Sequence, residues 1–179
     1  MDLLDTLLPR LRDEAPSLAA RLDHLDAEAT AQLEGVLGRF DAHDSGHLGQ
    51  GARRDLIRLL VLLADPADAT SLTWLNRALD YLDLNHNAKL EPAEYAEIMD
   101  IFDDFRRTDS DNLSLSAIEL ELLYAVLRHR DVDDSHRLER DERRALRAAL
   151  ARFDDFWATE VEENPRVREV LQQHGRLGG

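Results

Sequence analysis

The chain has 179 residues, of which 44% are apolar, 33% charged and 6% aromatic, and its formal net charge is −15. These values favour a folded, soluble protein over a disordered one, and the negative charge argues against nucleic-acid binding, in which lysine and arginine must neutralise phosphates. The chain has no cysteine, which excludes disulfides and thiolate metal sites. Because no segment approaches 18 uninterrupted apolar residues and the N-terminus has no basic region, we expect a cytoplasmic protein without a membrane span.

Residues 1–25 predict an N-terminal helical extension. Leucines recur at helical spacing from Leu3 to Leu11, although Pro9 limits the regularity of this first helix. A second short helical stretch follows Pro16.

The next helix is expected to begin after Asp26, whose side chain can accept hydrogen bonds from the first free amides. Its apolar face ends at Phe40, where a 12-residue polar stretch, 41–52, begins. Another helix with an apolar face follows this stretch. After Asp65-Pro66 the chain turns into a further helix, for which Ser71 is a candidate N-cap.

That helix leads into a second 12-residue stretch, 83–94, in which oxygen-bearing side chains stand at positions 1, 3, 5, 9 and 12. Position 7 can offer its backbone carbonyl, and position 8 is apolar. Ca²⁺ takes six to eight oxygen ligands, and a 12-residue loop can supply them from alternate positions. The expected ligands are Asp83, Asn85, Asn87, Lys89, Glu91 and Glu94.

This pattern, with an apolar helix on each side, resembles an EF-hand of the calmodulin and troponin C superfamily. The resemblance implies that Glu94, on the first turn of the following helix, closes the calcium site with both carboxylate oxygens. One residue departs from the family, because position 6 is Ala88 where the family has glycine.

The earlier stretch 41–52 follows the same pattern but lacks two ligands. Positions 6 and 8 keep glycine and an apolar residue, whereas His43 stands at position 3 and Ala52 replaces the closing carboxylate. We interpret it as a calcium-silent hand whose segment around Leu48 pairs as a short strand with the segment around Leu90. A transition-metal site formed by His43, His47 and a nearby aspartate is the alternative.

A polar, turn-rich segment, 106–112, marks a joint between two halves of the chain. Ser116 followed by Glu119 forms a capping box that opens the next helix. A further hand could be aligned with 108–119, but Thr108 replaces its first carboxylate. We therefore interpret this segment as a turn followed by an N-cap.

The third loop, 131–142, again carries a complete ligand set. Its expected calcium ligands are Asp131, Asp133, Ser135, Arg137, Glu139 and Glu142. Leu138 stands at position 8, and position 6 is His136 instead of glycine. The alternative for either complete loop is an acidic helix–turn–helix connection without a metal.

We predict an all-α fold of EF-hand helix–loop–helix units with short β bridges between loops. Residues 26–107 would form a paired lobe, 113–162 a helical region with the third hand, and 163–179 a short helix and tail. One helix is expected to continue from Glu142 to Trp157, and Asn164-Pro165 to end it.

Two functions of different classes are compatible with this pattern. In the first, the protein is a calcium sensor or calcium-modulated regulator, with Ca²⁺ as its only cofactor, and metal binding moves helices to expose a surface for a protein target. The alternative is a calcium-independent helical adaptor or scaffold. We expect no enzymatic activity, because the chain has no Gly-rich phosphate loop, nucleophile elbow or zinc-binding helix motif.

The third hand has no neighbour in this scheme, because EF-hands normally pair side by side. The strand around Leu138 would pair with another copy of the protein, with a partner protein, or with nothing. A penta-EF-hand protein dimerises through its unpaired hand, and we therefore expect a homodimer. The apolar residues Phe153, Phe156 and Trp157 would contribute to its contact.

Overall fold

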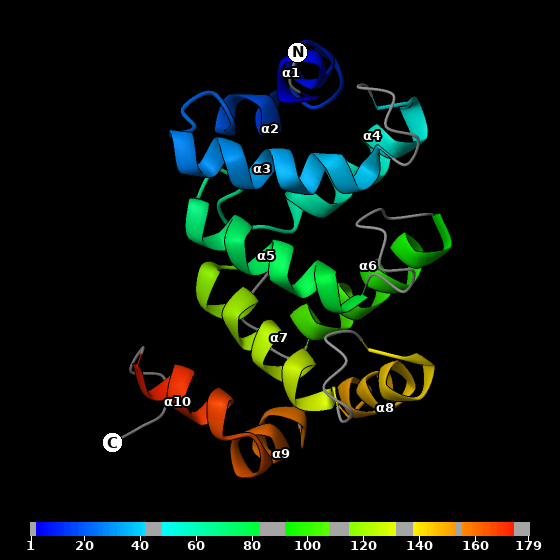
Figure 1. Ribbon diagram of the computed structural model, residues 1–179, viewed down its shortest axis with the longest axis vertical. Coiled ribbons are helices and arrows are strands. Elements are labelled where there is room, and N and C mark those ends of the chain that lie inside the picture. The colour runs from blue at the N-terminus through cyan, green and yellow to red at the C-terminus, as the bar shows by residue number, and fades with distance from the viewer. Residues whose placement is uncertain are drawn as a thin grey trace.

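The computed structural model describes residues 3–41, 48–82, 92–107, 115–131, 138–152 and 155–173, and within these ranges the protein is all-α, as predicted (Figure 1). The helices are α1 (Leu3–Glu14), α2 (Pro16–Arg21), α3 (Ala27–Phe40), α4 (Gln50–Val61), α5 (Ala69–Leu82), α6 (Pro92–Arg107), α7 (Ala117–Arg130), α8 (Arg140–Leu150), α9 (Phe156–Glu163) and α10 (Pro165–Gln173). Among the described residues, no helix is both long and apolar enough to cross a membrane.

Three helix pairs make up the body of the molecule, and we call them the first unit (α3 and α4), the second unit (α5 and α6) and the third unit (α7 and α8). Figure 1 shows α3, α5 and α7 one below another, with α4, α6 and α8 toward one side. Helix α5 packs against both α3 and α7. Helices α1 and α2 cover one end of this stack, and α9 and α10 cover the other.

A single cluster of buried apolar side chains runs from Leu4 in α1 to Val170 in α10. It includes residues from all three units, so each unit buries its apolar face against its neighbours. The division into a paired lobe and a separate third-hand region remains a prediction.

Local capping explains where several helices begin. The Asp26 carboxylate accepts a hydrogen bond from the Ala29 amide at 2.7 Å, and Ser116 with Glu119 forms the predicted capping box. The prediction for Ser71 was wrong, because α5 begins at Ala69. The Asp68 carboxylate takes the capping position and accepts from the Ser71 amide at 3.2 Å and its hydroxyl at 2.8 Å.

The helix predicted from Glu142 to Trp157 is divided in two, because α8 ends at Leu150 and α9 begins at Phe156. The break lets Phe156 enter the core, where it is buried and meets Phe105 edge-to-face, with ring centroids 6.3 Å apart. The predicted break at Asn164-Pro165 is confirmed, since α9 ends just before it and α10 begins at Pro165.

One isolated parallel bridge, between Leu63 and Leu115, occurs among the described residues. The Leu115 amide donates to the Leu62 carbonyl at 2.6 Å, and the Ala64 amide donates to the Leu115 carbonyl at 2.7 Å. The bridge joins the end of the first unit to the start of the third. The bridge predicted from Leu48 involves Leu90, which lies outside the described residues.

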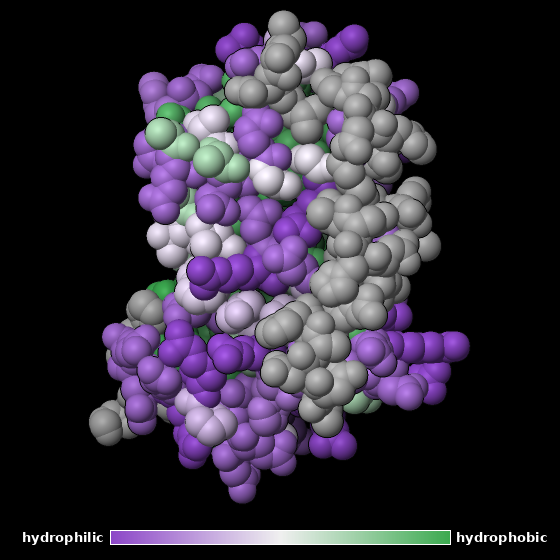
Figure 2. Space-filling view, in the orientation of Figure 1, coloured by the Kyte–Doolittle hydropathy of each residue, from purple (hydrophilic) through white to green (hydrophobic). Residues whose placement is uncertain are grey.

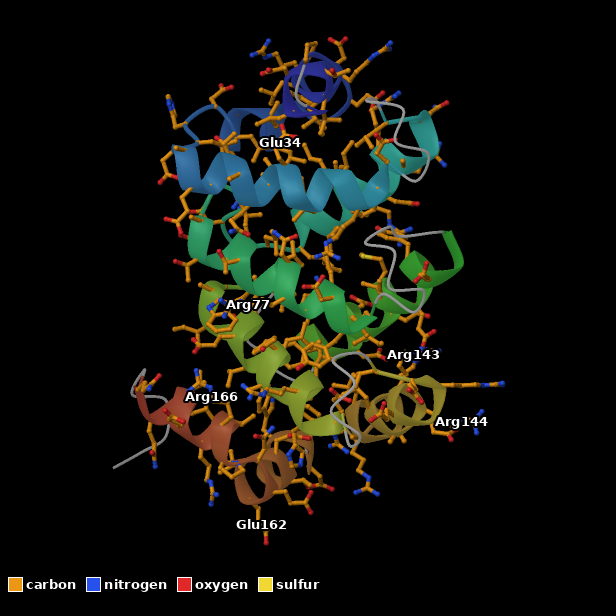
Figure 3. All side chains as sticks on the ribbon, viewed as in Figure 1. Glu34, Arg77, Arg143, Arg144, Glu162 and Arg166 are labelled. Atoms are coloured by element: carbon orange, nitrogen blue, oxygen red, sulfur yellow. The ribbon has the colours of Figure 1, made fainter. Side chains whose placement is uncertain are left out.

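Polar contacts join the helices at both ends of the molecule, and Figure 3 labels two of the side chains that make them. The Glu34 carboxylate of α3 accepts a hydrogen bond from the Leu4 amide of α1 at 2.8 Å. At the other end, Arg166 of α10 pairs with Glu121 of α7 at 3.2 Å. The terminal helices are therefore part of the folded body.

Candidate metal centres

The three units share one spacing between their helices. Nine residues, 41–49, 83–91 and 131–139, separate the entering helix from the exit helix in each unit. In the numbering of the 12-residue pattern, position 1 thus directly follows the entering helix. Position 12 is the third residue of the exit helix, within its first turn.

The described ends of the first and third loops have matching backbones. Asp41 has φ −90° and ψ 75°, and Asp131 has φ −81° and ψ 81°; each amide donates to the carbonyl three residues earlier at 3.3 Å. The exits also agree, with φ −67° and ψ 170° at Gly49 and φ −81° and ψ 174° at Glu139. The first loop therefore keeps the entry and exit geometry of the third although its ligand set is incomplete.

In both of these loops, the residue after position 12 is an arginine whose side chain donates a hydrogen bond to the backbone near the loop exit. Arg53 Nη1 donates to the Leu48 carbonyl at 2.8 Å, and Arg143 Nη1 donates to the Leu138 carbonyl at 3.1 Å. Neither arginine was predicted from the sequence as part of a loop. Alignment of loops 41–52 and 131–142 through the following residue would have found them.

Three of the third loop's expected ligands are described. Asp131 is 7% exposed at the end of α7, and Glu139 is exposed at the start of α8. The Glu142 carboxylate, on the first turn of α8, accepts a hydrogen bond from the Glu139 amide at 2.9 Å. The remaining expected ligands, Asp133, Ser135 and Arg137, lie outside the described residues.

In the second loop, Glu94 is the described ligand position. It lies on the first turn of α6 and is 6% exposed. The other expected ligands lie outside the described residues: Asp83, Asn85, Asn87, Lys89 and Glu91. The histidines of the alternative transition-metal site, His43 and His47, also lie outside them. Within the described ranges, no group of three or more His, Asp or Glu side chains could hold a metal ion.

A backbone hydrogen bond links the second and third units beside their loops. The Leu138 amide, at position 8 of the third loop, donates to the Tyr81 carbonyl of α5 at 2.7 Å. Leu138 thus contacts its own chain, because α7 packs against α5 and brings Leu138 to the end of the latter helix. The bond goes to a helix carbonyl and is not a strand pair, so the strand partner and the homodimer remain predictions.

The apolar residues assigned to the dimer contact are also used within the chain. Phe156 is buried, and Trp157 is half-buried with its ring 5.5 Å from that of Phe105. Phe153 lies outside the described residues. The described part of this aromatic group therefore stabilises the attachment of α9 to α6.

Tyr95 follows Glu94 directly and attaches α6 to α4. Its hydroxyl donates to the Asp55 carbonyl oxygen at 2.5 Å, and its ring meets Phe40 edge-to-face at 5.6 Å. Burial, together with the charge of Asp55, raises the pKa of Tyr95 well above its ordinary value, although the charge of Arg58 opposes the shift. The neutral phenol thus contributes to the position of the helix that carries Glu94.

This shift predicts a loss of stability in alkali. Since the folded state raises the pKa of Tyr95, its contribution is complete below pH 10, the ordinary tyrosine value, and declines as the pH rises above it. We expect the free energy of unfolding to fall by up to about 1.4 kcal/mol per pH unit per tyrosine above pH 10. Urea denaturation from pH 8 to 11 should show a smaller fall in Tyr95→Phe than in the unsubstituted protein. Part of the fall should persist, because burial also raises the pKa of Tyr81, to about 12. Equal falls in the two proteins would contradict the assignment.

Comparisons of the chain with protein-family models, with curated proteins and with solved structures found no match.

Proposed function

We propose that the protein binds calcium through EF-hand units at 83–94 and 131–142, and that it acts as a calcium sensor or calcium-modulated regulator of a protein target. The observation that carries the proposal is the common spacing of the three helix pairs. In both proposed calcium units, this spacing assigns an aspartate to the end of the entering helix and a glutamate to the first turn of the exit helix. A metal bound by both residues would fix one helix relative to the other.

The described contacts explain how such a site could affect the rest of the molecule. Glu94 precedes Tyr95, which bonds to α4, and Glu142 precedes Arg143, which pairs with Glu97 on α6 at 2.8 Å. A change in the position of either exit helix would therefore alter contacts between units. Tyr81 and Leu138 connect the entry of the second loop to the third.

The calcium stoichiometry tests this proposal. A calorimetric titration should detect two Ca²⁺ ions per chain, because loop 41–52 lacks the closing carboxylate. Glu94→Gln and Glu142→Gln should each remove one binding event, since the amide lacks the charge and the second oxygen ligand of the carboxylate. Asp141→Asn is the matched control: Asp141 is exposed beside Glu142 but stands at a non-ligand position, so both ions should remain.

Binding of no calcium, or of three ions, would contradict the assignment. Loss of an ion in Asp141→Asn would show that general negative charge, and not the loop pattern, determines binding.

A calcium-independent adaptor or scaffold is the second candidate, and the continuous core favours it. The buried apolar cluster is already continuous across all three units. Arg39 of α3 also pairs with Asp80 of α5 at 2.6 Å, which joins the first unit to the second. Circular dichroism and tryptophan fluorescence, with calcium and with a chelator, separate the two functions. The fluorescence of a sensor should change when calcium is added, whereas a scaffold should give the same spectra in both conditions.

A further inference from the structure

Helix α8 carries a stripe of four arginines, although the net charge of the chain is −15. The four follow the i, i+3, i+4, i+7 spacing that places side chains along one side of a helix: Arg140, Arg143, Arg144 and Arg147. On a different side of α8, Leu146 and Leu150 are buried in the core. The core thus fixes the rotation of α8 and with it the direction of the arginine stripe.

The stripe lines a groove between α6 and α8. The groove has a volume of about 590 Å³, and Glu97 and Asp104 of α6 line it together with the four arginines. Arg143 Nε donates to the Glu97 carboxylate at 2.8 Å, and Arg147 lies 3.5 Å from that of Asp100. Figure 3 labels Arg143 on the side of α8 that is toward α6. Two of the arginines are therefore paired across the helix interface.

The other two arginines of the stripe make no ion pair with any residue that the structure describes. Both of them, Arg140 and Arg144, are exposed. They are four residues apart, where like charges repel each other along a helix. Figure 2 shows a strongly hydrophilic surface at the lower right, where α8 lies in Figure 1. An anionic ligand in the groove would relieve this repulsion, and a guanidinium can bind a carboxylate through two parallel hydrogen bonds.

We propose that the groove between α6 and α8 binds an extended acidic segment of a partner protein, whose carboxylates pair with Arg140 and Arg144. The size of the stripe favours a single segment, because seven helical steps extend over only about 10 Å. The negative charge of the whole chain opposes a nucleic acid or an anionic membrane, because these present phosphates over an area wider than the arginine stripe. At physiological salt, charges farther away than about 8 Å are largely screened, so the local arginines dominate for a short peptide.

Fluorescence anisotropy with a labelled peptide of eight glutamates tests the proposal on the full chain. The titration is done in a chelator, so that the result is independent of calcium binding. We expect the double variant Arg140→Gln/Arg144→Gln to weaken binding about tenfold, as for the loss of two exposed ion pairs. Arg144→Gln alone should weaken binding about threefold, which keeps the test valid if the double variant folds poorly. Circular dichroism checks that each variant keeps its helix content.

The matched control is Arg54→Gln/Arg58→Gln, which removes the same charge from two exposed residues of α4. Arg54 occupies the same position after its loop as Arg144 does after the third loop. Affinity in this variant should stay within about twofold of the unsubstituted protein. Equal losses in both double variants, or no loss in either α8 variant, would overturn the proposal. Tighter binding of an eight-nucleotide RNA or of phosphatidylserine vesicles than of the peptide would also overturn it.

Discussion

Replacing Leu79 with alanine is expected to lower the free energy of unfolding by about 2–5 kcal/mol, the usual cost of deleting a buried leucine side chain. Leu79 is fully buried on α5, and α5 packs against the entering helices of both neighbouring units. The cavity would therefore lie in the core that joins all three units. Urea denaturation followed by circular dichroism should show one cooperative transition at a lower urea concentration.

Val61→Ala is the control for this prediction. Val61 is 57% exposed, so its truncation should change the free energy of unfolding by less than about 0.5 kcal/mol. Two separate transitions in Leu79→Ala would show that the units unfold independently, contrary to the shared core. A loss as small as that of Val61→Ala would show that α5 is not packed as described.

Glu160→Ala is expected to destabilise the protein by about 3 kcal/mol, toward the lower end of the range for breaking a buried ion pair. The side chain of Glu160 is 2% exposed and accepts a hydrogen bond from Arg130, whose side chain is 21% exposed. Arg130 Nε is buried without a hydrogen-bond partner among the described residues. Removing the carboxylate would leave a largely desolvated guanidinium unpaired at the end of α7.

Two further variants separate this cost from the net value of the pair. Arg130→Met/Glu160→Leu removes both charges and should recover most of the lost stability in urea denaturation, because no unpaired charge stays buried. Glu169→Gln breaks the exposed pair with Arg166 and should change the free energy of unfolding by less than about 1 kcal/mol. If Glu160→Ala behaved like Glu169→Gln, water would already solvate Arg130 in the folded protein.

The features that the sequence predicted correctly depend on neighbouring residues. The Asp26 cap and the capping box at Ser116 satisfy amides within the next three residues, so composition and spacing are sufficient to locate them. The same rule was ambiguous at the start of α5, where both Asp68 and Ser71 can cap, and the acidic side chain takes the position.

The features that the sequence did not predict depend on distant contacts. Apolar spacing in the sequence continues from α8 to Trp157, whereas the contact of Phe156 with Phe105 of α6, which accompanies the separate start of α9, joins residues far apart in the sequence. The contact between Tyr81 and Leu138 likewise follows from the stacking of α7 on α5. For the candidate metal site, spacing assigned Glu94 and Glu142 to the first turns of their exit helices, but it contained no information on how the units pack together.

The bridge between Leu63 and Leu115 closes a large loop of the chain, because the whole second unit lies between its two ends. Closing a loop of this size in an open chain costs about 4 kcal/mol of conformational entropy. Its two backbone hydrogen bonds contribute only about 1 kcal/mol each. The bridge therefore cannot hold the second unit in place. The bridge forms because α5 already lies between α3 and α7. Slow hydrogen exchange of its two amides, those of Ala64 and Leu115, would therefore report that α5 is packed between these helices.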